Sequence, residues 1–101
     1  MFVGATDAAD ADLTVAGADN VRWYAASDDA KRGFCIACGS LLFWKRNDAD
    51  RTSIMAGSLD DGTPLQPSFH IFVDSKPGWY AIDDGLPRYA RSSRDGPPLA
   101  T

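Results

Sequence analysis

Glutamate is absent from this chain of 101 residues, and all 14 acidic side chains are aspartate. Its absence excludes any acid–base mechanism that depends on a glutamate. Aspartate is a poor residue for helix interiors, because its short carboxylate competes for nearby backbone N–H groups. Together with the 9 Gly and 6 Pro, this composition favours strands and turns over helices.

Cysteine and basic residues are also scarce, and no long apolar run is present. Two cysteines cannot build the disulfide framework of a small secreted protein. The N-terminal sequence MFVGATDAADAD has no basic flank and no apolar stretch of a secretory signal. A net charge of −4 argues against a surface for nucleic acid or for an anionic membrane. We therefore expect a cytoplasmic protein with reduced thiols and with neither a nucleic-acid nor a membrane partner.

The apolar content of 45% is sufficient for one small globular domain. Short apolar segments recur every 8–12 residues or so between Gly, Pro and Asp clusters, the pattern of an all-β fold. Only residues 27–33 fit a single helical turn, and we expect no helix longer than about two turns. The predicted strands are residues 2–6, 12–17, 20–27, 41–46, 52–59, 69–74 and 79–82.

Both cysteines lie in the stretch RGFCIACGSLLFW, two residues apart, as Cys35 and Cys38. Such a pair is half of a zinc site, a redox dithiol or two unrelated core thiols. A redox pair usually opens a helix, whereas LLFW after this pair indicates a strand. The following Gly39 and Ser40 favour a zinc turn, in which backbone N–H groups point at the sulfurs. We predict that Cys35 and Cys38 are metal ligands, with a chain reversal at Gly39 and an antiparallel strand after it.

The chain has too few ligands for a closed zinc site, which needs four. The single histidine, His70, lies in a predicted strand, where a hydrogen-bonded structural role is favoured over a ligand role. Even with His70 the count stops at three.

Asp60, Asp61 and residues 83–85 are interpreted as turns. Lys76 is interpreted as a solvated turn residue, with binding of a carboxylate as the alternative, and the tryptophans as core or sheet-face residues. No residue is assigned to catalysis or to substrate binding.

Three blocks, RGFCIACGSLLFW, IMAGSLDD and HIFVDSKPGWYAIDDGLP, resemble in order and spacing the glutathione-dependent formaldehyde-activating enzyme family, also called the centromere-protein-V/GFA domain. The resemblance runs from about Phe2 to Tyr89. It implies an all-β, Mss4-like fold of several small antiparallel sheets with a zinc knuckle. It also implies a carbon–sulfur lyase activity that joins glutathione and formaldehyde into S-hydroxymethylglutathione, with zinc as cofactor.

In the family, an upstream Cys-x-Cys pair and the later Cys-x-x-Cys close one zinc, and a second upstream cluster holds another. Cys35 and Cys38 match the later pair, and no residue matches the upstream ligands. We therefore expect residues 1–89 to be an N-terminally incomplete domain of this type and residues 90–101 to be a loose tail. Its activity as it stands is doubtful.

Two functions of different classes follow from these observations. One is a zinc-dependent carbon–sulfur lyase-like protein that binds glutathione or a related thiol adduct. The other is a non-catalytic degenerate β domain that acts as a binding or structural module. An exposed sheet formed by residues 2–6, 41–46 and 52–59 would favour a homodimer. In such a dimer the cysteines of two chains could share one zinc.

Overall fold

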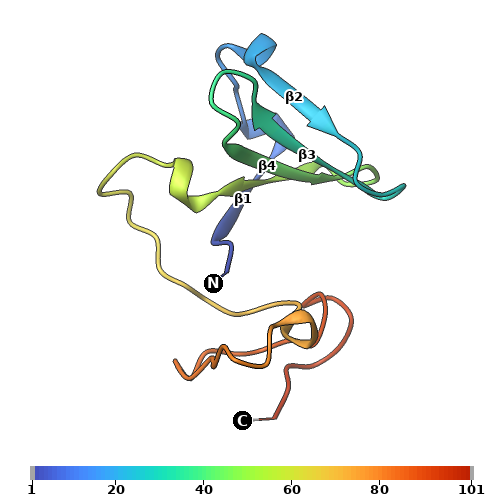
Figure 1. Ribbon diagram of the computed structural model, residues 1–101, viewed down its shortest axis with the longest axis vertical. Helices are drawn as coiled ribbons and strands as arrows, with labels where there is room; N and C mark the ends of the chain where they lie inside the picture. Colours follow the sequence, from blue (N-terminus) through green and yellow to red (C-terminus); the bar gives the residue numbers. More distant parts are fainter. Residues whose placement is uncertain (1, 101) are drawn as a thin grey trace. The chain divides into compact units, whose positions relative to one another are not determined.

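The computed structural model describes residues 2–100 of the chain. It divides into two compact units, residues 2–63 and the segment that begins at Pro64. All five strands belong to the first unit, and the described part of the second unit contains only a short helical turn and an isolated bridge (Figure 1). The helical turns of residues 2–100 are 3-10 turns of three residues each. The prediction of an all-β fold without a long helix is therefore confirmed.

The strands of the first unit form one antiparallel sheet in the order β1-β5-β4-β3-β2. β5 pairs with both β1 and β4, so the three segments predicted to share a sheet do so. The strands lie in this single sheet rather than in the several small sheets that the resemblance implied. Their bounds are Ala5–Ala9 for β1, Val21–Tyr24 for β2, Ala30–Cys35 for β3, Leu41–Arg46 for β4 and Arg51–Met55 for β5.

Strand β3 occupies the segment for which the sequence predicted a helical turn. The hydroxyl oxygen of Ser27 accepts hydrogen bonds from the backbone N–H groups of Asp29 and Ala30, both at 3.3 Å. This side chain closes a turn before the strand starts. Pairing with β2 on one side and β4 on the other then extends the chain from Ala30 onward. The prediction of a helical turn over residues 27–33 is therefore wrong.

The predicted strand over residues 12–17 is also not formed. The chain makes a 3-10 turn at Asp10–Asp12, and Gly17 takes a left-handed conformation with φ 73°. A second 3-10 turn, Ala18–Asn20, then leads into β2. The segment has no neighbouring strand to pair with, so its apolar side chains pack without forming a ladder. Leu13 and Val15 are half-buried.

The sheet face is built around a glycine that lies under two aromatic rings. Gly33 of β3 pairs with Trp23 of β2 and with Phe43 of β4. The two rings stack with centroids 5.9 Å apart and planes inclined by 22°. A Cβ atom on Gly33 would lie 3.1 Å from the Trp23 ring and 3.2 Å from Phe43. Glycine is therefore required here for close approach of the rings to the backbone.

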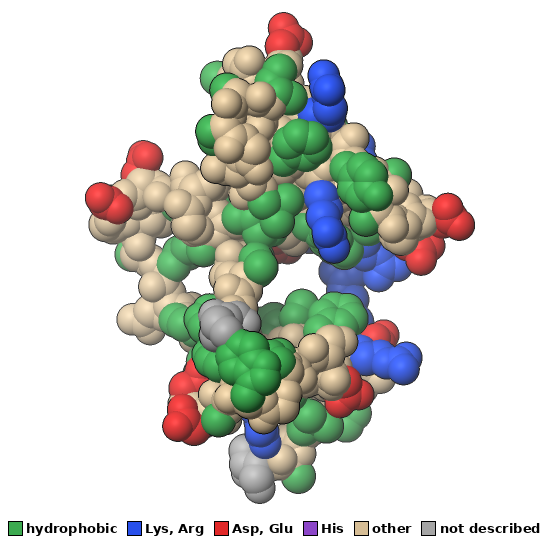
Figure 2. Space-filling view, viewed as in Figure 1, with side chains coloured by type: hydrophobic (Ala, Val, Ile, Leu, Met, Phe, Trp, Pro, Cys, Tyr) green, Lys and Arg blue, Asp and Glu red, His purple; other side chains and the backbone are tan. Residues whose placement is uncertain are grey.

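Few side chains of this small protein are buried. Ala30 and Met55 are the buried hydrophobic residues among the described ones, and Thr52 is the buried polar residue. Figure 2 shows hydrophobic side chains at the surface, between the charged ones. Trp79 is 70% exposed and Tyr24 61% exposed. The fold of both units therefore depends heavily on backbone and turn hydrogen bonds, because apolar burial is limited.

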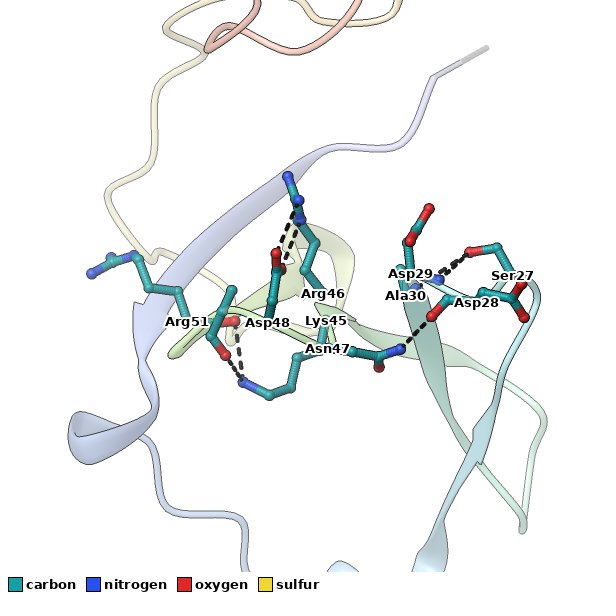
Figure 3. A network of polar contacts seen from close by, with 10 residues as sticks. Ser27, Asp28, Asp29, Ala30, Lys45, Arg46, Asn47, Asp48 and Arg51 are labelled. Atoms are coloured by element: carbon teal, nitrogen blue, oxygen red, sulfur yellow. Dashed lines mark hydrogen bonds and ion pairs between the residues drawn. The ribbon is translucent and has the colours of Figure 1, made fainter.

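Polar contacts join three turns at one end of the sheet, and Figure 3 shows those between the turn after β4 and the turn before β3. The ammonium of Lys45 pairs with the carboxylate of Asp10 and donates to the carbonyl oxygen of Ala49 at 3.0 Å. The side-chain amide of Asn47 donates to the carbonyl oxygen of Asp28 at 2.9 Å. These bonds hold the turn between β4 and β5 against the turn before β3 and against the 3-10 turn after β1.

The second unit is organised by one parallel bridge, between His70 and Arg88. The His70 N–H donates to the carbonyl oxygen of Pro87 at 2.8 Å, and the Tyr89 N–H donates to that of His70 at 2.9 Å. Phe72 has φ 54°, a left-handed conformation that interrupts the alternation of a strand. The predicted strand over residues 69–74 is therefore wrong, and the 3-10 turn Val73–Ser75 follows instead.

The rest of this unit is irregular. Residues 79–82, predicted as a strand, contain none, because the Tyr80 N–H donates within its own turn to Pro77 at 3.1 Å. Near the C-terminus the Leu99 N–H donates to the carbonyl oxygen of Arg88 at 2.6 Å. The domain boundary at residues 89 and 90 stays a prediction.

Candidate metal site at the cysteine turn

The two cysteines lie at the turn that joins β3 to β4. The N–H of Cys35 donates to the carbonyl oxygen of Ser40 at 2.9 Å, and the N–H of Gly39 donates to that of Cys35 at 2.7 Å. Gly39 has φ 79°, which only glycine adopts without strain. β4 then runs antiparallel to β3. The predicted reversal at Gly39 and the antiparallel strand after it are confirmed.

A further hydrogen bond holds the turn to the strand beside it. The N–H of Ile36 donates to the carbonyl oxygen of Asn20 at 2.9 Å, at the residue just before β2. The first residue of the turn is therefore fixed by a neighbouring segment as well as by its own hairpin.

Cys35 and Cys38 are free thiols, and neither is in a disulfide. Cys38 is exposed and Cys35 half-buried. The Cys38 thiol also donates to the Ser40 hydroxyl oxygen at 3.2 Å. As a thiolate, Cys38 instead accepts hydrogen bonds from the side chain and the backbone N–H of Ser40, and these bonds, with a smaller effect of Cys35, lower the pKa of its thiol. The turn therefore favours the thiolate, the form that binds metals.

A third ligand is not assembled near this pair. Within residues 2–100 no group of three or more His, Cys, Asp or Glu side chains could hold a metal ion. His70 lies in the second unit, where its Nε2 contacts Asp84 Oδ2 at 2.7 Å. Asp84 also accepts from the N–H of Leu86 at 3.1 Å. These bonds fit the interpretation of His70 as a hydrogen-bonded structural residue.

The other residues marked in the sequence lie in turns. The carbonyl oxygen of Asp60 accepts from the hydroxyl of Thr63 at 2.6 Å, and Gly85 has φ 75°. Lys76 is half-buried, and its ammonium donates to the carbonyl oxygens of Pro77 and Tyr80. Lys76 therefore lies in a turn as interpreted, with its ammonium bonded to the turn's own carbonyl groups.

The cluster around Asp10 was not predicted from the sequence. Its carboxylate pairs with Lys45 and accepts from the hydroxyl of Thr52 at 2.7 Å. The hydrogen bond from Lys45, followed by that from Thr52, lowers the pKa of Asp10. These partners are 35 and 42 residues away along the chain, so no local pattern marks them. Only the inward position of Thr52 in the apolar strand β5 hinted at a buried polar contact.

Comparison with known proteins agrees with the resemblance noted in the sequence. The family model described as glutathione-dependent formaldehyde-activating enzyme matches residues 2–75, which include the whole sheet and the cysteine turn. Searches of curated proteins and of solved structures gave no significant match. Among the described residues no helix is long and apolar enough to cross a membrane. The match spans about three quarters of the sequence, and the chain belongs to the glutathione-dependent formaldehyde-activating enzyme family.

Proposed function

We propose that the chain is a zinc-binding, carbon–sulfur lyase-like protein that acts on the adduct of glutathione and formaldehyde. Cys35 and Cys38 supply two of the zinc ligands in this proposal. The observation that carries it is a pair of neighbouring thiols on a glycine-reversed turn, inside the region that matches the family. Free cysteines also suit a cytoplasmic setting, where thiols stay reduced.

The thiol pair fits one half of a tetrahedral zinc site. Zinc–sulfur bonds of ~2.3 Å require two sulfurs on the same side of the turn, and the reversal at Gly39 (φ 79°) between the cysteines and β4 supports such an arrangement. The Ser40 hydroxyl, 3.2 Å from Cys38 Sγ, would orient and stabilise a liganding thiolate from outside the coordination shell. The Gly39 turn holds both sulfurs in place while the chain reverses.

The remaining two ligands come from outside this pair. A homodimer offers one source, because two copies of the turn would bring four thiolates to one ion. A further cysteine-bearing segment of the kind present in other family members offers another. With four protein thiolates the zinc at Cys35 and Cys38 would be structural. The Lewis-acid chemistry toward an aldehyde oxygen would belong to a second zinc with an open position, held by the further cysteine-bearing segment.

Metal content of the purified chain tests the proposal. We expect bound zinc and slow alkylation of both thiols in the reduced wild-type protein, and loss of zinc in Cys35→Ser and in Cys38→Ser. Ala37→Ser is the matched control, because it adds a hydroxyl at an exposed position of the same turn and leaves both thiols. Absence of zinc from wild type, or equal zinc in all four proteins, would contradict the proposal.

The activity itself is measured by exchange NMR between formaldehyde, glutathione and S-hydroxymethylglutathione. We expect the exchange rate to rise above the uncatalysed rate only with zinc-loaded protein. Light scattering with and without a strong chelator tests the shared site, since a dimer built on one zinc becomes a monomer when the ion is removed.

A second function is favoured by one observation, the lack of a third metal ligand near the cysteines within residues 2–100. A degenerate β domain that serves as a binding or structural module would need no metal. It predicts a folded, zinc-free wild-type chain with two readily alkylated thiols and no effect on the exchange rate.

A further inference from the structure

A cavity of about 210 Å³ that is widely open to solvent lies on the first unit, and neither cysteine lines it. Four of its lining residues are apolar, and two, Asp10 and Thr52, are polar; the apolar ones are Leu13, Val15, Trp23 and Phe43. A cavity of ~150 Å³ lined by apolar side chains accommodates benzene. The space therefore suits a single ring with a short substituent.

The aromatic part of the wall is fixed by the backbone beneath it. Trp23 and Phe43 stack at 5.9 Å over Gly33, where a Cβ atom would be in tight contact with both rings. Trp23 remains 39% exposed, so part of a large apolar surface faces solvent at a concave site. A ring placed against it would bury apolar area and gain the contacts of an aromatic pair.

Asp10 is the charged residue among those that line the cavity, and two lysines lie next to lining residues. The Asp10 carboxylate is balanced by Lys45 and is also hydrogen-bonded by Thr52. A second ammonium, that of Lys31, lies over the Trp23 ring at 4.5 Å from its centroid. Lys31 is also close enough to contribute to the lowered pKa of Asp10. Its charge has no carboxylate partner within the ion pairs of residues 2–100.

We propose that this cavity binds a small aromatic monocarboxylate, with its ring against Trp23 and Phe43 and its carboxylate toward Lys31. The apolar wall supplies most of the affinity, and the ammonium selects the anion over neutral and cationic analogues. This site is independent of zinc and of the glutathione chemistry proposed for the cysteine turn.

Titration of the full chain with three probes of equal shape tests the charge selection. The probes are 3-phenylpropionate, 3-phenylpropan-1-ol and 3-phenylpropylamine, followed by amide and indole NMR shifts. We expect the anion to bind about fivefold more tightly than the alcohol, the effect of one exposed ion pair, and the amine most weakly. The largest shifts should come from Trp23, Leu13 and Val15. Equal binding of all three probes, preference for the amine, or no binding would overturn the proposal.

Two substitutions on the same strand locate the selecting charge. Lys31→Gln should abolish the preference for the anion while binding of the alcohol is retained. Arg32→Gln is the matched control, because it removes one positive charge from the adjacent position of β3, on the opposite face of the sheet. Loss of the preference in both variants, or in neither, would contradict the role of Lys31.

Filling the cavity tests the apolar wall. Val15→Phe should weaken binding of both the anion and the alcohol by tenfold or more, with the cysteine turn unaffected. If this variant fails to fold, the Lys31→Gln comparison still decides the proposal, since glutamine is a polar replacement at this half-buried position.

Discussion

The two units of this chain hold their backbones in different ways. Residues 2–63 place 26 residues in five strands whose ladders run continuously across one sheet. The unit from Pro64 on has one parallel bridge, one 3-10 turn and a set of single backbone hydrogen bonds. Ladder bonds support one another because each paired residue positions the next, whereas isolated bonds open one at a time. We therefore expect greater local stability in residues 2–63 than in the unit from Pro64 on.

Hydrogen exchange would show the largest difference between the units. We expect backbone N–H groups of β3, β4 and β5 to exchange on the order of a hundredfold more slowly than those of residues 64–100, because central strands are paired on both sides. Exchange measured residue by residue by NMR at neutral pH checks this. Equal protection from exchange in the two units would contradict the expected difference in their local stability.

Overpacking at Gly33 should selectively break the first unit. Gly33→Ala places a Cβ atom 3.1 Å from Trp23 and 3.2 Å from Phe43. We expect a loss of about 2 kcal/mol in the free energy of unfolding, as for other overpacked sites. Gly57→Ala is the matched control, since a Cβ atom there meets nothing within 4 Å. Urea unfolding followed by tryptophan fluorescence makes the comparison. Equal stability of the two variants would show that Trp23 and Phe43 can shift to accept the Cβ atom without loss of stability.

Low pH should lower the free energy of unfolding of each unit through one aspartate of that unit. This effect should be smaller than the difference in hydrogen exchange and the effect of Gly33→Ala. Lys45 chiefly lowers the pKa of Asp10, and the N–H of Leu86 chiefly lowers that of Asp84. A lowered pKa in the folded state gives stability that is present above the ordinary value of 3.8. This stability is lost as the pH falls through the folded-state pKa.

Asp10→Asn should therefore flatten the acid dependence in the sheet while the second unit is unchanged, and Asp84→Asn should do the reverse. NMR shifts of both units from about pH 6 to about pH 2 provide the readout. Loss of the acid response in both units from either substitution would show that they unfold together.

The sequence predicted the sheet better than the second unit for a physical reason. β4 was predicted with its observed bounds, Leu41–Arg46, because alternation and the following Asn-Asp turn are local signals. Residues 69–74 carry an equally strong apolar signal, but the bridge to Arg88 and the left-handed Phe72 are set by tertiary contacts. β3 was missed because its Lys, Arg and Gly residues are poor strand formers that extend only when paired on both sides.

The candidate sites differ in the same respect. Cys35, Cys38 and Gly39 form a local turn, so their spacing alone predicted the geometry of the reversal. The cavity is lined by Asp10 and Thr52, which meet only after the sheet has formed. The local geometry of the cysteine turn was therefore predictable from the sequence, and the long-range contacts of the cavity were not.

The hydrogen bonds of the cysteine turn have a consequence for the cost of chelation. Three backbone bonds, at 2.9, 2.7 and 2.9 Å, already close the loop that carries both sulfurs and fix its first residue to Asn20. A flexible peptide loses chain entropy when it chelates an ion. In this turn much of that entropy has already been lost on folding. Ion capture at the first two coordination bonds should then resemble binding to a rigid bidentate ligand, with a rate set by loss of water from the metal.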